Sequence, residues 1–94
     1  MSYRVRLSSV AQRDLARLEN FLCARSPAAA IRAATTIRKA VKSLRRLPER
    51  GRPYEIPGVR ELLVPFGSSG YVVRYLITAD EVIIIRIFHS LEER

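Results

Sequence analysis

The chain is poor in the residue types that build metal centres, disulfides and nucleophilic dyads. Its 94 residues include one cysteine, Cys23, and one histidine, His89. A single cysteine cannot form an internal disulfide, which favours a reducing, cytoplasmic setting. No Cys/His cluster has the spacing of a zinc site, so we expect neither a metal nor a cofactor. Cys23 is interpreted as a small hydrophobic residue near a helix end.

Other familiar signatures are also absent. The sequence has no glycine-rich phosphate-binding loop and no carboxylate pair arranged for acid–base catalysis. The longest apolar runs, such as Val82 to Ile85, are far too short to span a bilayer. No charged-then-apolar leader opens the chain, so no signal peptide is expected. These observations predict a soluble protein without a membrane partner and without an evident catalytic motif.

Positive charge is in excess, and it is unevenly distributed. The net charge is +8; residues 1–50 hold twelve Lys/Arg against three acidic residues (+9), and residues 51–94 hold five against six (−1). Such a field attracts a polyanion: a nucleic acid, an acidic protein or an anionic membrane. The alternative is a solvated helical surface rich in arginine, and charge alone does not decide between these interpretations.

The first residues alternate and then change to a helical period. Residues 3–7 place apolar side chains on one face and arginines on the other, which predicts a half-buried strand. Ser8 or Ser9 offers a capping hydroxyl for a helix that ends near Ala24, with Asp14 as an acidic residue in an early turn.

A second helix is predicted to begin at Ser26-Pro27 and to end before Pro48. A capping hydroxyl followed by proline is typical of a helix N-terminus, because the missing proline N–H has no helical acceptor there. The connection between the two helices is only a few residues long, which predicts an antiparallel helical hairpin.

The second half of the chain is predicted to form strands. Residues 48–58 contain three prolines and two glycines and are interpreted as a loop. Strands are predicted over residues 59–66, 71–77 and 82–88, joined by a hairpin connection at 67–70 and a turn at 78–80.

These elements make one α+β domain over residues 1–94. A helical hairpin is expected to pack on a small antiparallel sheet in a two-layer β-α-α-β-β-β arrangement, with the first strand in the same sheet. The core expected from the periodicity consists of Leu15, Leu18, Ile37, Val41, Leu44, Val73, Ile83 and Ile85.

Arginine and aromatic residues on the strands supply the candidate site: Arg60, Tyr71, Arg74, Tyr75, Arg86 and His89. Alternation predicts that Arg74 and Arg86 share the concave face away from the helices, where they would hold phosphates or an acidic peptide. His89, just past the last strand, is a candidate acid or base. Alternatively, the arginines pair with carboxylates across the sheet and His89 is an ordinary strand-end residue; those carboxylates are Glu61, Asp80 and Glu81.

Several short motifs occur in a characteristic order. They are Ser-x-x-Ala-x-x-Asp-Leu (8–15), Leu47-Pro48, Gly-x-Arg-Glu-Leu (58–62), Tyr-x-Val-x-Tyr (71–75) and Ile-x-Arg-Ile-Phe-His (84–89). Over nearly the whole chain this order resembles the RelE/ParE superfamily of toxins from type II toxin–antitoxin systems. The resemblance implies a RelE/ParE-like toxin domain that an acidic antitoxin holds silent in a toxin–antitoxin complex. Target or antitoxin contacts are then expected at the cations on the second helix and the strands: Arg38, Lys42, Arg45, Arg46, Arg60, Arg74, Arg86 and His89.

The resemblance allows two mechanisms. RelE-like members are ribosome-dependent messenger RNA endoribonucleases, in which an arginine tends to begin the third strand and a tyrosine-like group follows the terminal histidine or arginine. This chain has Tyr71 and Ser90 at those places, which favours the ParE-like mechanism, inhibition of DNA gyrase by binding without enzymatic activity. The alternative is ribosome-dependent cleavage by Arg74, Arg86 and His89. A basic nucleic-acid-binding module is a weaker alternative, because the exposed aromatic platform of single-strand binders is missing.

Overall fold

Two serine hydroxyls start the two helices where the sequence predicts them. A computed structural model describes residues 2–92, with α1 spanning Ser9–Cys23 and α2 spanning Pro27–Ser43. Ser8 Oγ accepts from Ala11 N at 3.0 Å, and Ser26 Oγ accepts from Ala29 N at 3.2 Å. Cys23 is the last residue of α1, but it is exposed and is therefore not a core residue.

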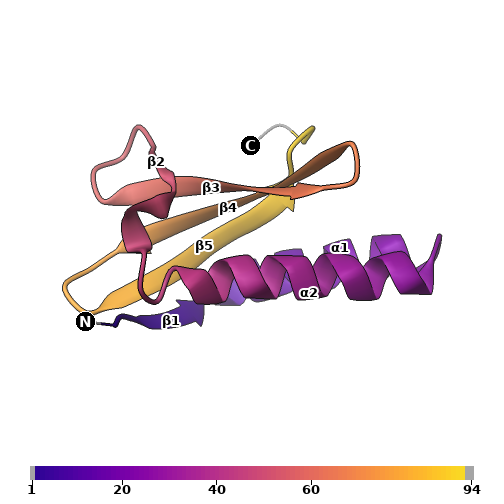
Figure 1. Cartoon of the computed structure of the whole chain (residues 1–94), viewed down its shortest axis with the longest axis horizontal. Coiled ribbons are helices and arrows are strands. Elements are labelled where there is room, and N and C mark those ends of the chain that lie inside the picture. The colour runs from indigo at the N-terminus through magenta and orange to yellow at the C-terminus, as the bar shows by residue number, and fades with distance from the viewer. Residues whose placement is uncertain (1, 93–94) are drawn as a thin grey trace.

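The helices lie side by side against one face of a five-stranded sheet (Figure 1). Its strands are β1 (Arg4–Leu7), β2 (Arg52–Pro53), β3 (Val59–Phe66), β4 (Ser69–Ile77) and β5 (Glu81–His89), in the order β1-β5-β4-β3-β2. The antiparallel β3-β4-β5 meander is as predicted, whereas β1 runs parallel to β5. The sheet is therefore mixed and not wholly antiparallel, which the long helical connection after β1 permits.

The proline-rich segment contains more structure than the predicted loop. It forms a 3-10 helix, η1 (Pro48–Arg50), and the short strand β2, which pairs with β3. The buried Tyr75 hydroxyl donates to Pro48 O at 2.7 Å and accepts from Gly51 N at 2.8 Å. A Cβ on Gly51 would lie 2.6 Å from that hydroxyl, so these two hydrogen bonds require glycine at position 51. The β3–β4 connection is shorter than predicted, because Ser69 already belongs to β4.

The core lies between the helices and the sheet. The sequence prediction of which residues face this core was right except on β5. Leu15, Leu18, Ile37, Val41, Leu44 and Val73 are buried as expected. Ile83 and Ile85 are only half-buried, and the fully buried residues of β5 are Val82, Ile84 and Ile87. The β4–β5 register shifts between Arg74 and Tyr75, which pair with Arg86 and Ile84, so Ile85 is an extra residue that reverses the alternation.

Candidate functional site

Arg74 lies on the sheet face away from the helices, where its charge is neutralised. The Arg74 Nε and Nη2 atoms lie 2.8 and 2.7 Å from Glu61 Oε2 on the neighbouring strand, and both side chains are only 13% exposed. The guanidinium also lies over the rings of Tyr54 and Phe88, at 4.3 and 5.2 Å from their centroids. Cross-strand pairing with Glu61, the alternative left open by the sequence, is therefore what Arg74 does.

Arg86 forms a two-point ion pair with Asp14 of α1. Arg86 Nε donates to Asp14 Oδ2 at 2.8 Å, and Arg86 Nη2 donates to Asp14 Oδ1 at 3.1 Å. The same carboxylate accepts from the backbone N–H of Ile87 at 2.9 Å. The β1 pairing ends at Leu7 opposite Ile84, so β5 continues beyond its neighbour. The Asp14 side chain thus replaces the missing strand partner at this edge.

This network holds Asp14 ionised. Burial alone raises the pKa of Asp14, but the hydrogen bonds from Arg86 and Ile87 and the positive charges of Arg86 and Arg17 outweigh it, so the pKa lies below its ordinary value. The hydrogen bond from the Asp14 carboxylate in turn raises the pKa of Arg86. Arg86 is therefore a permanent cation that is already paired with Asp14. It is suited neither to proton transfer nor to binding a phosphate as a free guanidinium.

Both ring nitrogens of His89 are occupied. Its Nε2 lies 2.9 Å from Ser69 Oγ, and its Nδ1 accepts from the backbone N–H of Leu91 at 3.2 Å. Because Nδ1 is an acceptor, the neutral ring that fits this geometry carries its proton on Nε2 and donates it to Ser69. In that tautomer His89 donates to Ser69 and accepts no proton from it, and the hydrogen bond links the first residue of β4 to the last residue of β5.

His89 lies apart from the other two catalytic candidates. Arg74 and Arg86 are direct cross-strand neighbours, whereas His89 pairs with the buried Tyr71 and meets that ring edge-on at 5.5 Å between centroids. Tyr71 belongs to the core beneath the helices, so alternation puts His89 on the opposite face from Arg74. Burial raises the pKa of the Tyr71 hydroxyl, which makes it a weaker acid as well.

Arg60 supports the loop. Its guanidinium donates to Gly51 O at 2.7 Å and to Glu49 O at 3.4 Å, which fastens η1 and β2 to β3. Tyr75, the cross-strand partner of Arg60 on β4, is fully buried. These two members of the predicted constellation hold backbone within the fold.

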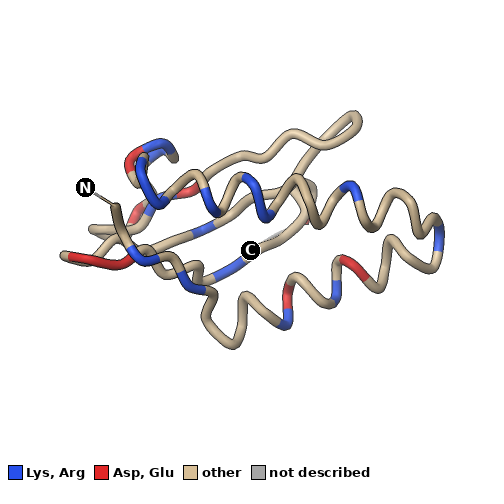
Figure 2. Tube along the Cα trace, turned by 60° about the horizontal axis from the view of Figure 1, so that its bottom comes forward, with Lys and Arg blue, Asp and Glu red and all other residues tan. Residues whose placement is uncertain are grey.

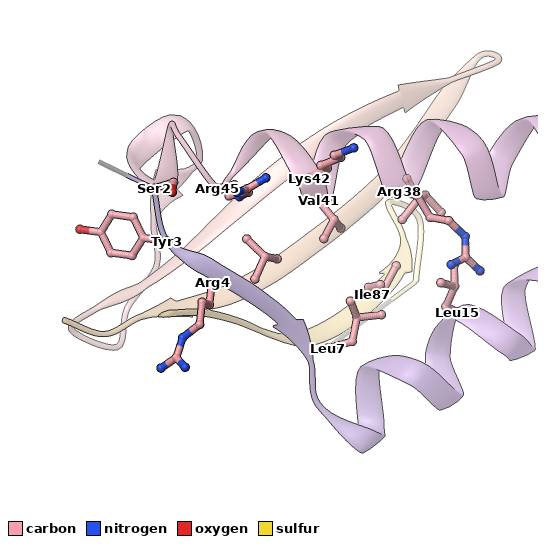
Figure 3. A pocket seen from close by; sticks show the side chains of 12 residues that line it. Ser2, Tyr3, Arg4, Leu7, Leu15, Arg38, Val41, Lys42, Arg45 and Ile87 are labelled. Carbon is pink, nitrogen blue, oxygen red and sulfur yellow. The ribbon is translucent and has the colours of Figure 1, made fainter. Parts of the chain in front are cut away.

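The helical cations border a groove between β1 and α2. The groove has a volume of about 450 Å³. Its apolar lining includes Val5, Leu7, Leu15, Ile37, Val41 and Ile87. In Figure 3, Leu7 and Ile87 lie across the gap from Val41, while Arg38, Lys42 and Arg45 extend from α2. Arg46 does not line this groove but lies at another hollow on α2 with Lys39 and Leu47.

Sequence reasoning missed the partner of Arg86 and this groove. Asp14 looks like a dipole-favouring acid near a helix start, yet it is 6% exposed and lies beyond the first turn of α1. Its position within the apolar stripe between Ala11 and Leu15 was the available indication of burial. No sequence pattern predicts the groove, because it forms between β1 and α2, which are about 35 residues apart in the chain.

Within residues 2–92 no group of His, Cys, Asp and Glu side chains is arranged to hold a metal ion. No helix in the same part of the chain has the length and apolarity required to cross a membrane.

Comparisons with known proteins match nearly the whole chain. The family model described as the ParE toxin of type II toxin–antitoxin systems matches residues 5–94. Toxin RelE1 of Caulobacter vibrioides is 42% identical over 94 residues, which is 100% of both chains. Toxin RelE3 of the same organism is 42% identical over 90 residues, covering 96% of this chain and 97% of the relative.

Solved toxin–antitoxin structures share the fold. A chain from the chromosomal ParDE system of P. aeruginosa aligns with a TM-score of 0.79 and 25% identity, covering 94% of this chain and 96% of that one. A chain from the RelBE2 toxin–antitoxin complex of Mycobacterium tuberculosis aligns with a TM-score of 0.58 and 28% identity, covering 95% and 99%. The matching proteins thus carry both ParE and RelE names.

Proposed function

Because the chain belongs to the ParE toxin family of type II toxin–antitoxin systems, within the RelE/ParE superfamily, we propose that it inhibits DNA gyrase by binding and that an acidic antitoxin neutralises it. The target and the antitoxin surface are separate parts of this proposal. The RelE names of the relatives make ribosome-dependent RNA cleavage the alternative that an experiment has to separate.

The proposal that gyrase is the target rests on one observation: the candidate catalytic side chains are already bonded to other groups of the chain. Cleavage through a ribose 2′-hydroxyl needs a base, an acid and a cation within reach of one phosphate. Arg74 and Arg86 are instead paired with Glu61 and Asp14, and His89 lies on the other face with both nitrogens bonded. A binding inhibitor needs an accessible surface and no such constellation, and the exposed cations of α2 and the groove beside β1 supply one.

The decisive experiment combines purified chain, DNA gyrase, relaxed plasmid and ATP without ribosomes. We expect blocked supercoiling or trapped cleaved DNA at micromolar toxin, measured on agarose gels. Under the alternative, translating ribosomes would support messenger RNA cleavage, and His89→Ala or Arg86→Ala would lower that cleavage by roughly 10²-fold or more. Ribosome-dependent cleavage together with normal supercoiling would replace gyrase with the ribosome as the target.

The groove between β1 and α2 is the proposed antitoxin site. Its apolar lining suits one face of an amphipathic helix, and the adjacent Lys42 and Arg45 complement acidic residues on the flanks of that helix. Arg38 lies at the same rim but is paired with Glu19 at 3.1 Å. Within residues 2–92, β1 pairs on one side only, with β5, so an extended segment could add beside it. An antitoxin segment that is disordered alone would fold on this surface.

Association with the cognate antitoxin is expected to slow as salt rises. Exposed cations steer an acidic partner through long-range attraction, which salt screens. Stopped-flow measurements should show a lower on-rate for Lys42→Gln/Arg45→Gln than for the control Arg13→Gln/Arg52→Gln, with a small change in off-rate, because exposed pairs contribute little each. An on-rate that is indifferent to salt between low and physiological ionic strength would contradict a steering role.

A further inference from the structure

We propose that the outer face of α2 binds the phosphate backbone of duplex DNA without reading its sequence. This surface, here called the outer stripe, consists of Arg32, Thr35, Lys39, Lys42 and Arg46, all of which are exposed. The spacings of three and four residues keep the four members within α2 on one side of the helix, away from the buried Ala33, Ile37 and Val41, and Arg46 follows in the turn after Ser43. The proposal is independent of the gyrase target.

The charge of this region is not compensated nearby. Residues 20–48 contain seven Lys/Arg and no Asp or Glu. In Figure 2 the tube of α2 carries blue segments and no red, whereas α1 carries both colours. Among the described residues, none of the four cations of the outer stripe takes part in an ion pair, in contrast to Arg4, Arg6, Arg17, Arg38, Arg74 and Arg86.

The geometry of the outer stripe suits a regular row of phosphates. Arg32 and Lys42 are ten residues apart on a straight helix, or about 15 Å at a rise of ~1.5 Å per residue. The chain continues past Ser43 in a further tight turn, in which Arg46 N donates to Ser43 O at 3.3 Å. Duplex DNA presents about one negative charge per ~1.7 Å of its axis, so several phosphates face a row of this length.

The chemistry of the outer stripe favours nucleic acid over protein. Hot spots of protein interfaces are enriched in Trp, Tyr and Arg side chains that pack into desolvated pockets, whereas the stripe consists of four exposed cations and one hydroxyl, with no aromatic ring. Lys, Arg and Thr are the side chains that contact phosphate oxygens in DNA complexes. The apolar groove that suits a protein partner lies on the β1 side of α2, lined by different residues except Lys42.

The outer stripe also favours a duplex over a single strand. Single-strand binders stack successive bases on exposed aromatic rings, and α2 contains no aromatic residue. A rigid row of cations on one helix gains most from phosphates that are already held in a regular array. Binding through charge alone would be strongly salt-dependent and tolerant of sequence.

The test is fluorescence anisotropy of a labelled random-sequence duplex with the full chain over a range of salt. Arg32→Gln/Lys39→Gln/Arg46→Gln is the stripe variant, and Lys42 is left intact because it also lines the groove. Arg13→Gln/Arg25→Gln/Arg52→Gln is the control variant with the same net charge. Arg13, Arg32 and Lys39 lie in helices, where glutamine has a propensity similar to that of lysine and arginine. Arg25, Arg46 and Arg52 are exposed positions outside the helices, so both variants should fold, which circular dichroism checks.

We expect the stripe variant to lose roughly 10²-fold in duplex affinity at ~0.1 M salt and its log–log salt slope to become shallower by roughly 2.7, at about 0.9 per phosphate contact. The control variant should change much less. Equal losses in both variants would mean that net charge alone acts, and single-stranded RNA or DNA binding at least as tightly as the duplex would also overturn the proposal. Gyrase inhibition is measured separately, so absence of duplex binding would leave the target proposal standing.

Discussion

Leu44→Ala is expected to lower the free energy of unfolding by roughly 2–5 kcal/mol, because it removes buried apolar atoms and leaves a cavity that the surrounding structure fills only in part. Leu44 is the C-terminal cap of α2 and is 0% exposed within the core under the sheet. Chemical denaturation followed by circular dichroism measures the loss.

Leu47→Ala is the matched control for this substitution. Leu47 lies three residues further along the chain and is 61% exposed, so the same change there should stay within about 0.5 kcal/mol. A loss below about 0.5 kcal/mol for Leu44→Ala would place that side chain on the surface. A large loss for both variants would indicate that the turn after α2 is packed more tightly than its exposure suggests.

The helices could be predicted closely because their signals are local. Ser8, Ser26 and Pro27 act within one turn of the residues they cap, and the apolar spacing repeats over four turns. The antiparallel meander could be predicted for the same reason, since each of its strands follows the previous one through a short turn. The parallel pairing of β1 with β5 joins residues more than 70 positions apart and leaves no local trace.

The site could be predicted less well, because one inserted residue changes the facing of a strand. Alternation alone placed Ile83 and Ile85 in the core, and the bulge opposite Arg74 and Tyr75 put Val82 and Ile84 there. Bulges depend on the register between two strands, which a single strand's pattern does not contain.

The charge partners show the same limit. Arg74 and Glu61 lie on adjacent strands, and their pairing is one of the carboxylate pairings that the sequence allows as an alternative to phosphate binding. The pairing of Arg86 with Asp14 depends on α1 passing the exposed edge of β5, which only the tertiary fold creates. A strand's own sequence therefore identifies candidate catalytic residues but does not show which tertiary neighbours those side chains will contact.

Asp14→Ala is expected to destabilise the fold by roughly 2–4 kcal/mol, because it removes one partner of a largely buried ion pair. The change would leave Arg86 without its carboxylate and the Ile87 N–H without its acceptor. The expected loss is smaller than for a fully buried pair, because the Arg86 side chain is 32% exposed. Asp14→Asn keeps an acceptor for Ile87 and should lose less.

The pH dependence of this difference identifies its cause. The pKa of Asp14 is lower in the folded chain than in the unfolded chain, so its contribution is complete at pH values well above the ordinary carboxyl value of ~3.9 and is lost as the pH falls through the folded pKa. The gap in stability between the wild-type chain and Asp14→Ala should therefore stay constant from neutral pH to about 5 and narrow in more acidic solution. Asp80→Ala is the control, because Asp80 pairs with Arg4 at 2.8 Å where both side chains are largely exposed, and it should cost about 0–1 kcal/mol. Equal effects of the two substitutions, or a gap that does not narrow in acid, would mean that the Asp14 carboxylate does not hold α1 to the edge of β5.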